Sequence, residues 1–160
     1  MPPLAGHKNA EYMMAALGAD LVVTHSSQLR AAETATFETR RTIPMIVRPK
    51  TRAQLQECVR AANRLQIALY PVSTGKNWGY GSSVPPADAC ALVDLSGMNR
   101  ITGFNERLGY VTVEPGVTQR QLYRFLREKD SRLWMDATGS SPDCSIIGNT
   151  VERGFGHTIH

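Results

Sequence analysis

Apolar residues in this chain gather in short runs that predict β-strands. Residues 43–47 form a β-branched apolar run that Pro49 closes, which is the pattern of a strand ending at a proline. Runs of the same kind predict further strands at 67–71, 91–95, 101–104 and 110–113. Only a few polar residues separate the last two runs, so we expect them to form a β-hairpin.

Helical patterns follow two of the turns, and each opens with a capping box. Thr51 precedes Gln54 and Thr118 precedes Gln121 by three residues, so hydroxyl and amide side chains can satisfy the backbone at both helix starts. Apolar positions then recur with the 3.6-residue period of a helix that buries one face. They are Leu55, Cys58, Val59, Ala62 and Leu65 after the first box, and Leu122, Phe125 and Leu126 after the second.

The first forty residues are rich in alanine and only mildly amphipathic. Their concentrated apolar positions are few, namely Met13, Met14, Leu17 and the run 21–23. This pattern predicts one or two helices that rest against another part of the protein.

Two glycine- and serine-rich regions contain little that can be buried. The first, 73–83, holds three glycines within seven residues, and the second runs from 136 to 158. Glycine lets a backbone approach a ligand closely, and consecutive N–H groups in such turns form a nest for oxyanions. Phosphate is therefore the expected ligand of the first region. Lys76 would supply the opposite charge, and Ser73, Thr74 and Ser82 would donate hydrogen bonds. The alternative is a tight, solvated connection between two strands.

Composition and charge narrow the class of protein. At 160 residues, with 42% hydrophobic and 20% charged positions, the chain has the composition of an ordinary globular domain. Its net charge of +4 is scattered, which suits an anionic cofactor and argues against a nucleic-acid partner. No apolar run approaches the ~18 residues that span a bilayer, and the first residues lack a signal-peptide pattern. We therefore expect a cytoplasmic chain with no membrane partner.

Other known binding and catalytic motifs are incomplete in this sequence. A Walker A loop needs glycine where Tyr70 stands and serine or threonine where Asn77 stands. The Ser-x-x-Lys string at 73–76 lacks a Lys-Thr-Gly partner, and no Gly-x-Gly-x-x-Gly follows a predicted strand. The three cysteines and four histidines lack the spacing of a disulfide framework or a zinc site, so we expect no metal. His157 is the one histidine expected near a ligand, with an exposed loop position as the alternative.

Three segments carry a family pattern when they are taken together and in order. Residues 71–81 read PVSTGKNWGYG, and 113–118 read VEPGVT. The third segment reads GSSPDCSIIGN over 139–149 and ERGFGHT over 152–158. In these segments the chain resembles the flavoenzymes of the vanillyl-alcohol oxidase and p-cresol methylhydroxylase family. The resemblance covers about residues 43–158 and extends only loosely over the first forty.

The resemblance implies an α+β fold: a p-cresol methylhydroxylase-type FAD-binding domain of mixed sheets with flanking helices, incomplete at its C-terminus. It divides the chain into an N-terminal helical segment, 1–40, and the N-terminal part of that domain, 41–160. The first loop would cradle the pyrophosphate of FAD, and the later segment would pass along the flavin. The cofactor-binding residues so implied are Pro71, Ser73, Thr74, Gly75, Lys76, Asn77, Trp78, Gly79, Pro115, Gly116, Gly139, Ser140, Ser141, Asp143, Cys144, Ser145, Gly148, Asn149, Glu152, Gly154, Gly156 and His157.

The family's reaction is the oxidation of a 4-alkylphenol, of the 4-cresol or vanillyl-alcohol type, at its benzylic carbon, with hydride passing to the flavin. The resemblance therefore implies a small phenolic substrate for the full-length protein. Whether the further partner is a second copy of the protein or an electron-acceptor protein stays open. No residue here is predicted to be catalytic, because the family's phenol-binding side chains lie in a region outside the matched segments.

Two departures from the family pattern bear on function. Berberine-bridge-type relatives attach the flavin to a histidine in the first loop, where this chain has Asn77, so we expect no covalent link from this loop. After His157 and Thr158 the family continues with Pro-Tyr-Gly, whereas Ile159 and His160 follow here, which predicts a truncated chain. The 160 residues alone are then expected to be inactive. The alternative is a catalytically silent remnant that acts, if at all, as a nucleotide-binding or interaction module.

Overall fold

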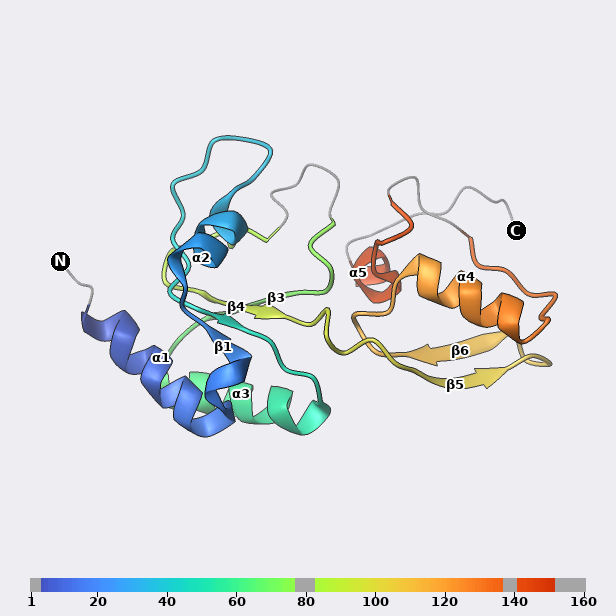
Figure 1. Cartoon of the computed structure of the whole chain (residues 1–160), viewed down its shortest axis with the longest axis horizontal. Helices are drawn as coiled ribbons and strands as arrows, with labels where there is room; N and C mark the ends of the chain where they lie inside the picture. Colours follow the sequence, from blue (N-terminus) through green and yellow to red (C-terminus); the bar gives the residue numbers. More distant parts are fainter. Residues whose placement is uncertain (1–3, 77–82, 137–140, 152–160) are drawn as a thin grey trace.

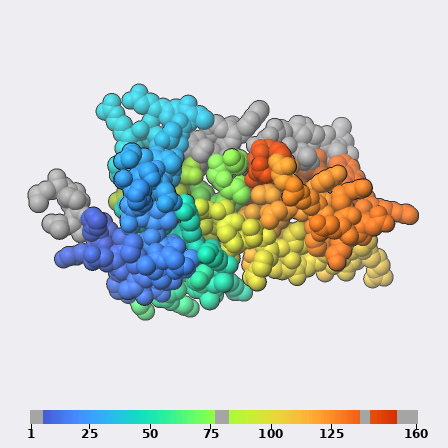
Figure 2. Space-filling model, viewed as in Figure 1, coloured from blue at the N-terminus to red at the C-terminus, as the bar shows by residue number. Residues whose placement is uncertain are grey.

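The computed structural model describes residues 4–76, 83–136 and 141–151. These residues form two lobes, each built around its own sheet (Figure 1). The N-terminal lobe has a four-stranded sheet and the C-terminal lobe a two-stranded one. The space-filling view shows the two lobes side by side along the long axis (Figure 2).

Three of the four strands in the N-terminal sheet are parallel. The sheet order is β1 (Val22–Val23), β2 (Ile46–Val47), β4 (Ala91–Asp94) and β3 (Leu69–Val72). β2 and β3 both run parallel to β4, so that Leu92 pairs with Ile46 on one side and with Tyr70 on the other. β1 pairs antiparallel with β2. Near-continuous apolar strands of this kind occur where helices cover both faces of a sheet.

Two helices cover one face of this sheet. α1 (Leu4–Leu17) and α3 (Arg52–Leu65) lie against each other, and Met13 and Cys58 belong to one fully buried cluster with Val47. Among the described residues, no helix combines the length and hydropathy that crossing a bilayer requires.

The opposite face is covered by α2 (Ser26–Glu33), whose Leu29 packs with Ile46 and Leu92. Ile46 and Val47 can serve the two faces because successive side chains of a strand point in opposite directions. The 3-10 helix η1 (Ala19–Leu21) leads from α1 into β1. The first forty residues thus share the core of the parallel strands, and the division at residue 40 stays a prediction.

The first predicted strand is shorter in the structure than its apolar pattern suggests. Of residues 43–47, only Ile46–Val47 pair in the sheet. Ile43 is buried, but its N–H donates to the Glu33 carboxylate at 2.7 Å, so this end of the run is tied to α2. The predicted strand at 91–95 is confirmed as β4, one residue shorter.

The first capping box and the helix behind it are confirmed in α3. Val59 is an exception to the predicted face: 43% of its surface is exposed, while Ala61 is buried in its place. Past the end of α3, the Ile67 N–H still donates to the Ala62 carbonyl at 3.0 Å, so β3 begins only at Leu69 rather than at 67.

The C-terminal lobe is a β-hairpin with a helix packed on it. β5 (Ile101–Asn105) and β6 (Tyr110–Val113) pair antiparallel, which confirms the predicted hairpin. The rings of Phe104 and Phe125 meet edge to face with centroids 5.4 Å apart. This aromatic contact joins the hairpin to the helix above it.

The helix on the hairpin begins at the second capping box, as predicted. α4 (Gln119–Glu128) has Thr118 as its N-cap and buries Leu122 and Leu126. The short helix α5 (Ile146–Val151) lies at the side of the lobe that faces the N-terminal sheet (Figure 1).

A close passage at Gly116 joins the two lobes. A Cβ atom at this position would lie 2.6 Å from the carbonyl oxygens of Leu95 and Ser96 and 2.9 Å from that of Met98. The Gly116 N–H donates to the Met98 carbonyl at 2.8 Å. Only glycine fits this approach, so the turn after β4 and the turn after β6 stay in contact.

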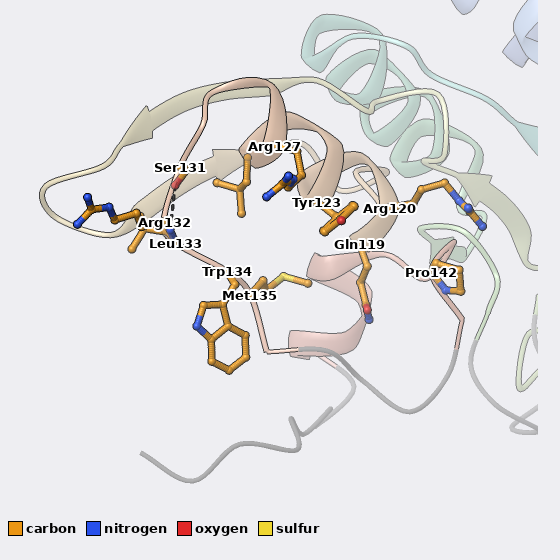
Figure 3. Close-up of a pocket in the computed structure, with 11 residues that line it drawn as sticks. Gln119, Arg120, Tyr123, Arg127, Ser131, Arg132, Leu133, Trp134, Met135 and Pro142 are labelled. Carbon is orange, nitrogen blue, oxygen red and sulfur yellow. Dashed lines mark hydrogen bonds between the residues drawn. The ribbon is translucent and has the colours of Figure 1, made fainter.

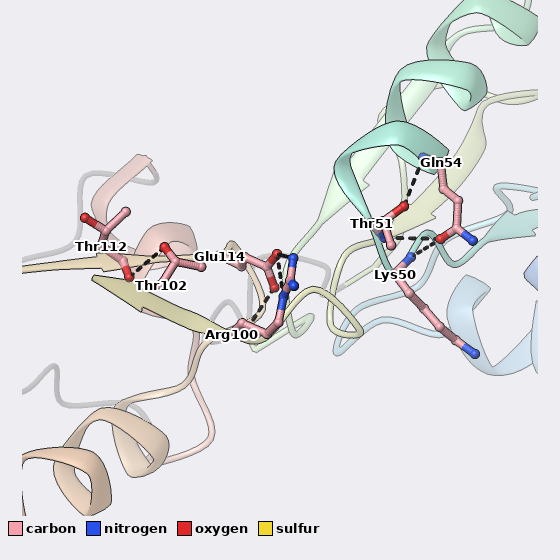
Figure 4. A network of polar contacts seen from close by, with 7 residues as sticks. All are labelled: Lys50, Thr51, Gln54, Arg100, Thr102, Thr112 and Glu114. Carbon is pink, nitrogen blue, oxygen red and sulfur yellow. Dashed lines mark hydrogen bonds and ion pairs between the residues drawn. The ribbon is translucent and has the colours of Figure 1, made fainter. Parts of the chain in front are cut away.

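An ion pair between Arg100 and Glu114 lies beside this passage (Figure 4). Arg100 Nη2 lies 2.7 Å from Glu114 Oε1, and the Arg100 backbone N–H donates to Glu114 Oε2 at 2.9 Å. The hydrogen bond from the Arg100 guanidinium holds the pKa of the Glu114 carboxyl below its usual range. The start of β5 and the end of β6 are tied together here.

We expect Gly116→Ala to destabilise the chain, because its methyl group would overlap three carbonyl oxygens. Overpacking of this kind typically costs about 1–3 kcal/mol. Urea unfolding measures the loss. Gly97→Ala is the matched control, since a Cβ there meets its nearest neighbour, Lys50 Cγ, at an ordinary 3.6 Å. Equal urea midpoints for the two variants would contradict the close approach of Gly116 to the three carbonyl oxygens.

Candidate functional site

The candidate site begins where β3 leaves the sheet. Residues 73–76 follow the carboxyl end of β3, next to the carboxyl end of the parallel strand β4. Open sheets with parallel strands bind ligands beyond these ends, because the loops that leave neighbouring strands meet there. The predicted phosphate loop therefore lies at the edge of the sheet where a ligand is expected.

The second glycine- and serine-rich region comes to the same place. Cys144 Sγ contacts the Lys76 carbonyl oxygen at 3.5 Å, across 68 positions of sequence. A Cβ atom at Gly148 would lie 3.3 Å from Ser73 Oγ, so α5 approaches the loop closely. The structure thus brings together the two regions that the sequence singled out separately.

Gly75 gives the loop its shape. Its φ of +66° lies in the left-handed region, and a Cβ there would lie 3.0 Å from Ser83 Oγ. The N–H groups of Thr74, Gly75 and Lys76 donate to no backbone carbonyl of the described residues. A glycine turn with such N–H groups and an adjacent lysine has the donor set that a pyrophosphate needs.

Ser145 holds the second region in place. Its hydroxyl donates to the Pro115 carbonyl at 2.6 Å and accepts from the Gly148 N–H at 2.9 Å, and the residue is 5% exposed. Pro115 precedes the close passage at Gly116. The structure therefore gives Ser145, Pro115 and Gly116 a packing role, and their contact with a cofactor stays a prediction.

Asp143 is paired with Arg120 of α4. Arg120 Nε lies 2.8 Å from Asp143 Oδ1, and both side chains are about half exposed. The Arg120 hydrogen bond, with a smaller contribution from the charge of Lys76, holds the pKa of the Asp143 carboxyl below its usual range. A lowered pKa means that the pair stabilises the fold above the unfolded-state pKa and is lost as the pH falls through the folded one.

Several predicted site residues lie outside the described residues. They are Asn77, Trp78, Gly79, Gly139, Ser140, Glu152, Gly154, Gly156 and His157. Of the others, Pro71 lies within β3, Ser141 accepts the Asp143 N–H through its hydroxyl at 3.2 Å, and Asn149 lies within α5. The described residues contain no group of three His, Cys, Asp or Glu side chains suited to a metal ion.

The sequence analysis missed a polar cluster beside the loop. A cavity of about 260 Å³ opens next to Thr74 and Gly75, between α2 and the ends of the parallel strands. In its lining, Arg48 lies 3.2 Å from Asp94 and donates to Gln28 at 3.0 Å. These three residues come from separate elements with no shared spacing, so only the fold reveals them.

A larger groove, of about 490 Å³, runs along α4 (Figure 3). Arg120 and Pro142 lie at one end of this groove, and Arg132 and Trp134 lie toward the other. The first end adjoins the candidate site through Asp143.

Comparison with known proteins agrees with this geometry. Residues 43–160 match a family model described as an FAD binding domain. The chain belongs to this FAD-binding domain family. The match has nearly the same limits as the resemblance noted above, and it includes both loops of the candidate site.

Solved structures show the type of domain within the family. The chain superposes on p-cresol methylhydroxylase with a TM-score of 0.88 at 30% identity, covering 99% of this chain and 31% of that one. For 4-ethylphenol oxidase from Gulosibacter chungangensis the TM-score is 0.90 at 28% identity, with the same coverage. The p-cresol methylhydroxylase-type α+β fold is confirmed.

Curated relatives differ in the reaction that they are named for. The 1'-carboxy-chondrochloren decarboxylase of Chondromyces crocatus is 53% identical over 90% of this chain and 27% of its own length. The flavoprotein subunit of 4-cresol dehydrogenase (hydroxylating) from Pseudomonas putida is 35% identical over 66% of this chain and 20% of its own length. The chain thus spans about a quarter of the first relative and a fifth of the second.

We expect Ser145→Ala to destabilise the chain, because the Pro115 carbonyl and the Gly148 N–H both lose a partner. Leaving buried polar groups unpaired costs about 1–3 kcal/mol. Urea unfolding measures this, with Thr150→Ala as control: Thr150 is exposed, and its hydroxyl donates to the Ile146 carbonyl of its own helix at 3.0 Å. A Ser145→Ala midpoint as high as that of the control would refute the structural role of the hydroxyl.

Proposed function

We propose that this chain binds FAD and forms the flavin-binding portion of a flavin-dependent oxidoreductase. One observation carries the proposal: the two glycine- and serine-rich regions meet beyond the carboxyl ends of β3 and β4, with Cys144 against Lys76. The membership of the chain in the FAD-binding domain family supports the same cofactor.

In this proposal the 73–76 loop binds the pyrophosphate. The N–H groups of Thr74, Gly75 and Lys76 donate to phosphate oxygens, and the ammonium group of Lys76 supplies the opposite charge. Arg120 neutralises the carboxylate of Asp143, which therefore does not cancel the positive charge of the loop. The second region would then pass beside the flavin end of the cofactor.

The reaction proposed for the whole flavoenzyme is oxidation of a 4-alkylphenol at its benzylic carbon. FAD supplies the hydride acceptor, and the protein supplies binding and orientation. The 35% identity to a 4-cresol dehydrogenase subunit supports this substrate class. The two electrons taken from the phenol must leave again, so the enzyme also needs an electron acceptor, either oxygen or a protein.

A second candidate reaction is a flavin-dependent decarboxylation. The observation that favours it is the 53% identity to a relative named as a decarboxylase, over 90% of this chain. Both candidates use the same cofactor site, because the residues that bind the pyrophosphate do not contact the reacting carbon. The binding experiment below therefore tests the FAD binding that both reactions require.

We expect FAD to bind the chain and Gly75→Val to abolish that binding. A β-branched side chain at a φ of +66° strains the turn and crowds Ser83, at the point where the backbone should meet phosphate. Thermal unfolding with and without FAD measures binding, since ligand at ~100 times its dissociation constant adds about 2.7 kcal/mol to the folded state.

The matched control is Gly109→Val, which strains a glycine at nearly the same φ, +65°, in the hairpin turn. It should lower the melting temperature and leave the shift caused by FAD unchanged. Wild-type chain that FAD fails to stabilise would refute the proposed function. FAD binding retained in Gly75→Val would refute the placement of the pyrophosphate.

Turnover by the 160-residue chain tests directly for either reaction. The chain is mixed with FAD, a dye acceptor, and either 4-cresol or a 4-alkylphenol that carries a carboxyl group. We expect the 160 residues to bind FAD without reducing the dye. Dye reduction with 4-cresol would establish phenol oxidation, and release of carbon dioxide would establish decarboxylation.

A further inference from the structure

The start of α4 holds the second glycine- and serine-rich region through backbone hydrogen bonds. The N–H of Gln119 donates to the Cys144 carbonyl at 3.0 Å, and the N–H of Arg120 donates to the Pro142 carbonyl at 2.8 Å. The first N–H groups of a helix have no partner within the helix. Here the 141–145 segment supplies the missing acceptors, so it lies across the first turn of α4.

Arg120 contacts this segment a second time, through its side chain. Its guanidinium lies against both oxygens of Asp143, with Nε at 2.8 Å and Nη2 at 3.4 Å. Figure 3 shows Arg120 at the end of the groove where Pro142 lies. One residue therefore holds two consecutive residues of the segment, Pro142 by its backbone and Asp143 by its side chain.

The other side of the same segment faces the 73–76 loop. Cys144 Sγ meets the Lys76 carbonyl at 3.5 Å, and a Cβ atom at Gly148, further along, would lie 3.3 Å from Ser73 Oγ. The segment thus lies between α4 on one side and the phosphate loop on the other. The position of the segment therefore determines whether Cys144 covers the Lys76 side of the loop.

We propose that Arg120 is a positioning residue of the flavin site: it holds the 141–145 segment so that Cys144, and Gly148 of the helix that follows, lie against the 73–76 loop. The role at a flavin site rests on the proposed function, but the position of the segment can be measured without the cofactor. An ion pair this exposed contributes little to global stability. We therefore expect its removal to move the segment without unfolding the protein.

Cys144 reports the position of the segment directly. It is 4% exposed, and the other cysteines, Cys58 and Cys90, are buried in the N-terminal lobe and serve as internal references. Iodoacetamide labels thiols as they become accessible, and mass spectrometry reads each cysteine separately. In Arg120→Ala we expect faster labelling of Cys144 alone, with an unchanged midpoint of urea unfolding.

Two milder variants and one control complete the experiment. Arg120→Lys keeps a positive charge beside Asp143, and Asp143→Asn keeps one acceptor oxygen for Arg120, so we expect intermediate labelling rates from both. Arg127→Ala is the control, because Arg127 lies on the same helix and pairs with no carboxylate of the described residues. We expect it to label like the wild type. Labelling of Cys144 unchanged in all three test variants would overturn the positioning role.

FAD affinity then tests the link to the proposed function. We expect Arg120→Ala to weaken FAD binding by up to about fivefold, the factor that corresponds to loss of an exposed ion pair, with Arg127→Ala unchanged. Faster Cys144 labelling without any loss of affinity would overturn the role of Arg120 at the flavin site. If wild-type chain does not bind FAD but Arg120→Ala exposes Cys144, the proposed function fails and the positioning of the segment is supported.

Discussion

At Gly116 the turn after β6 runs against three carbonyl oxygens of the turn after β4, at a separation that leaves no space for a side chain. This contact sets one lobe against the other. Ser145 bonds to the neighbouring Pro115 carbonyl, and Gly148 bonds to Ser145, so the path of the second glycine-rich region starts from the same point. The meeting of that region with the loop after β3 therefore depends on a passage that lies outside the candidate site.

Much of the fold could be predicted from local patterns. Both capping boxes and the hairpin follow from side chains close in sequence, and the structure confirms them. The ends of the strands could not be predicted, because they depend on distant partners. Ile43 is apolar and β-branched, yet its N–H bonds a carboxylate on α2, and no local pattern reveals that competition.

The candidate site shows the same division. Glycine content singled out Gly75 and Gly148, and the structure gives the first a left-handed φ and brings the second close to Ser73. Arg120 was not found, because its significance comes from where Pro142 and Asp143 arrive in space. Charged residues on an amphipathic helix normally face solvent, so nothing in the sequence distinguishes this arginine from its neighbours on α4.

The order of strands in the N-terminal sheet has a consequence for how the chain folds during synthesis. β4 is the central strand, with β2 on one side and β3 on the other, yet it is the last of the four to be made. Until β4 has been made, β2 and β3 lack their shared neighbour, and the backbone N–H and C=O groups along one edge of each strand are unpaired. Pairings between distant segments form slowly and leave such edges open to aggregation. During this period of synthesis, the unpaired strands of the N-terminal half are a binding site for a chaperone.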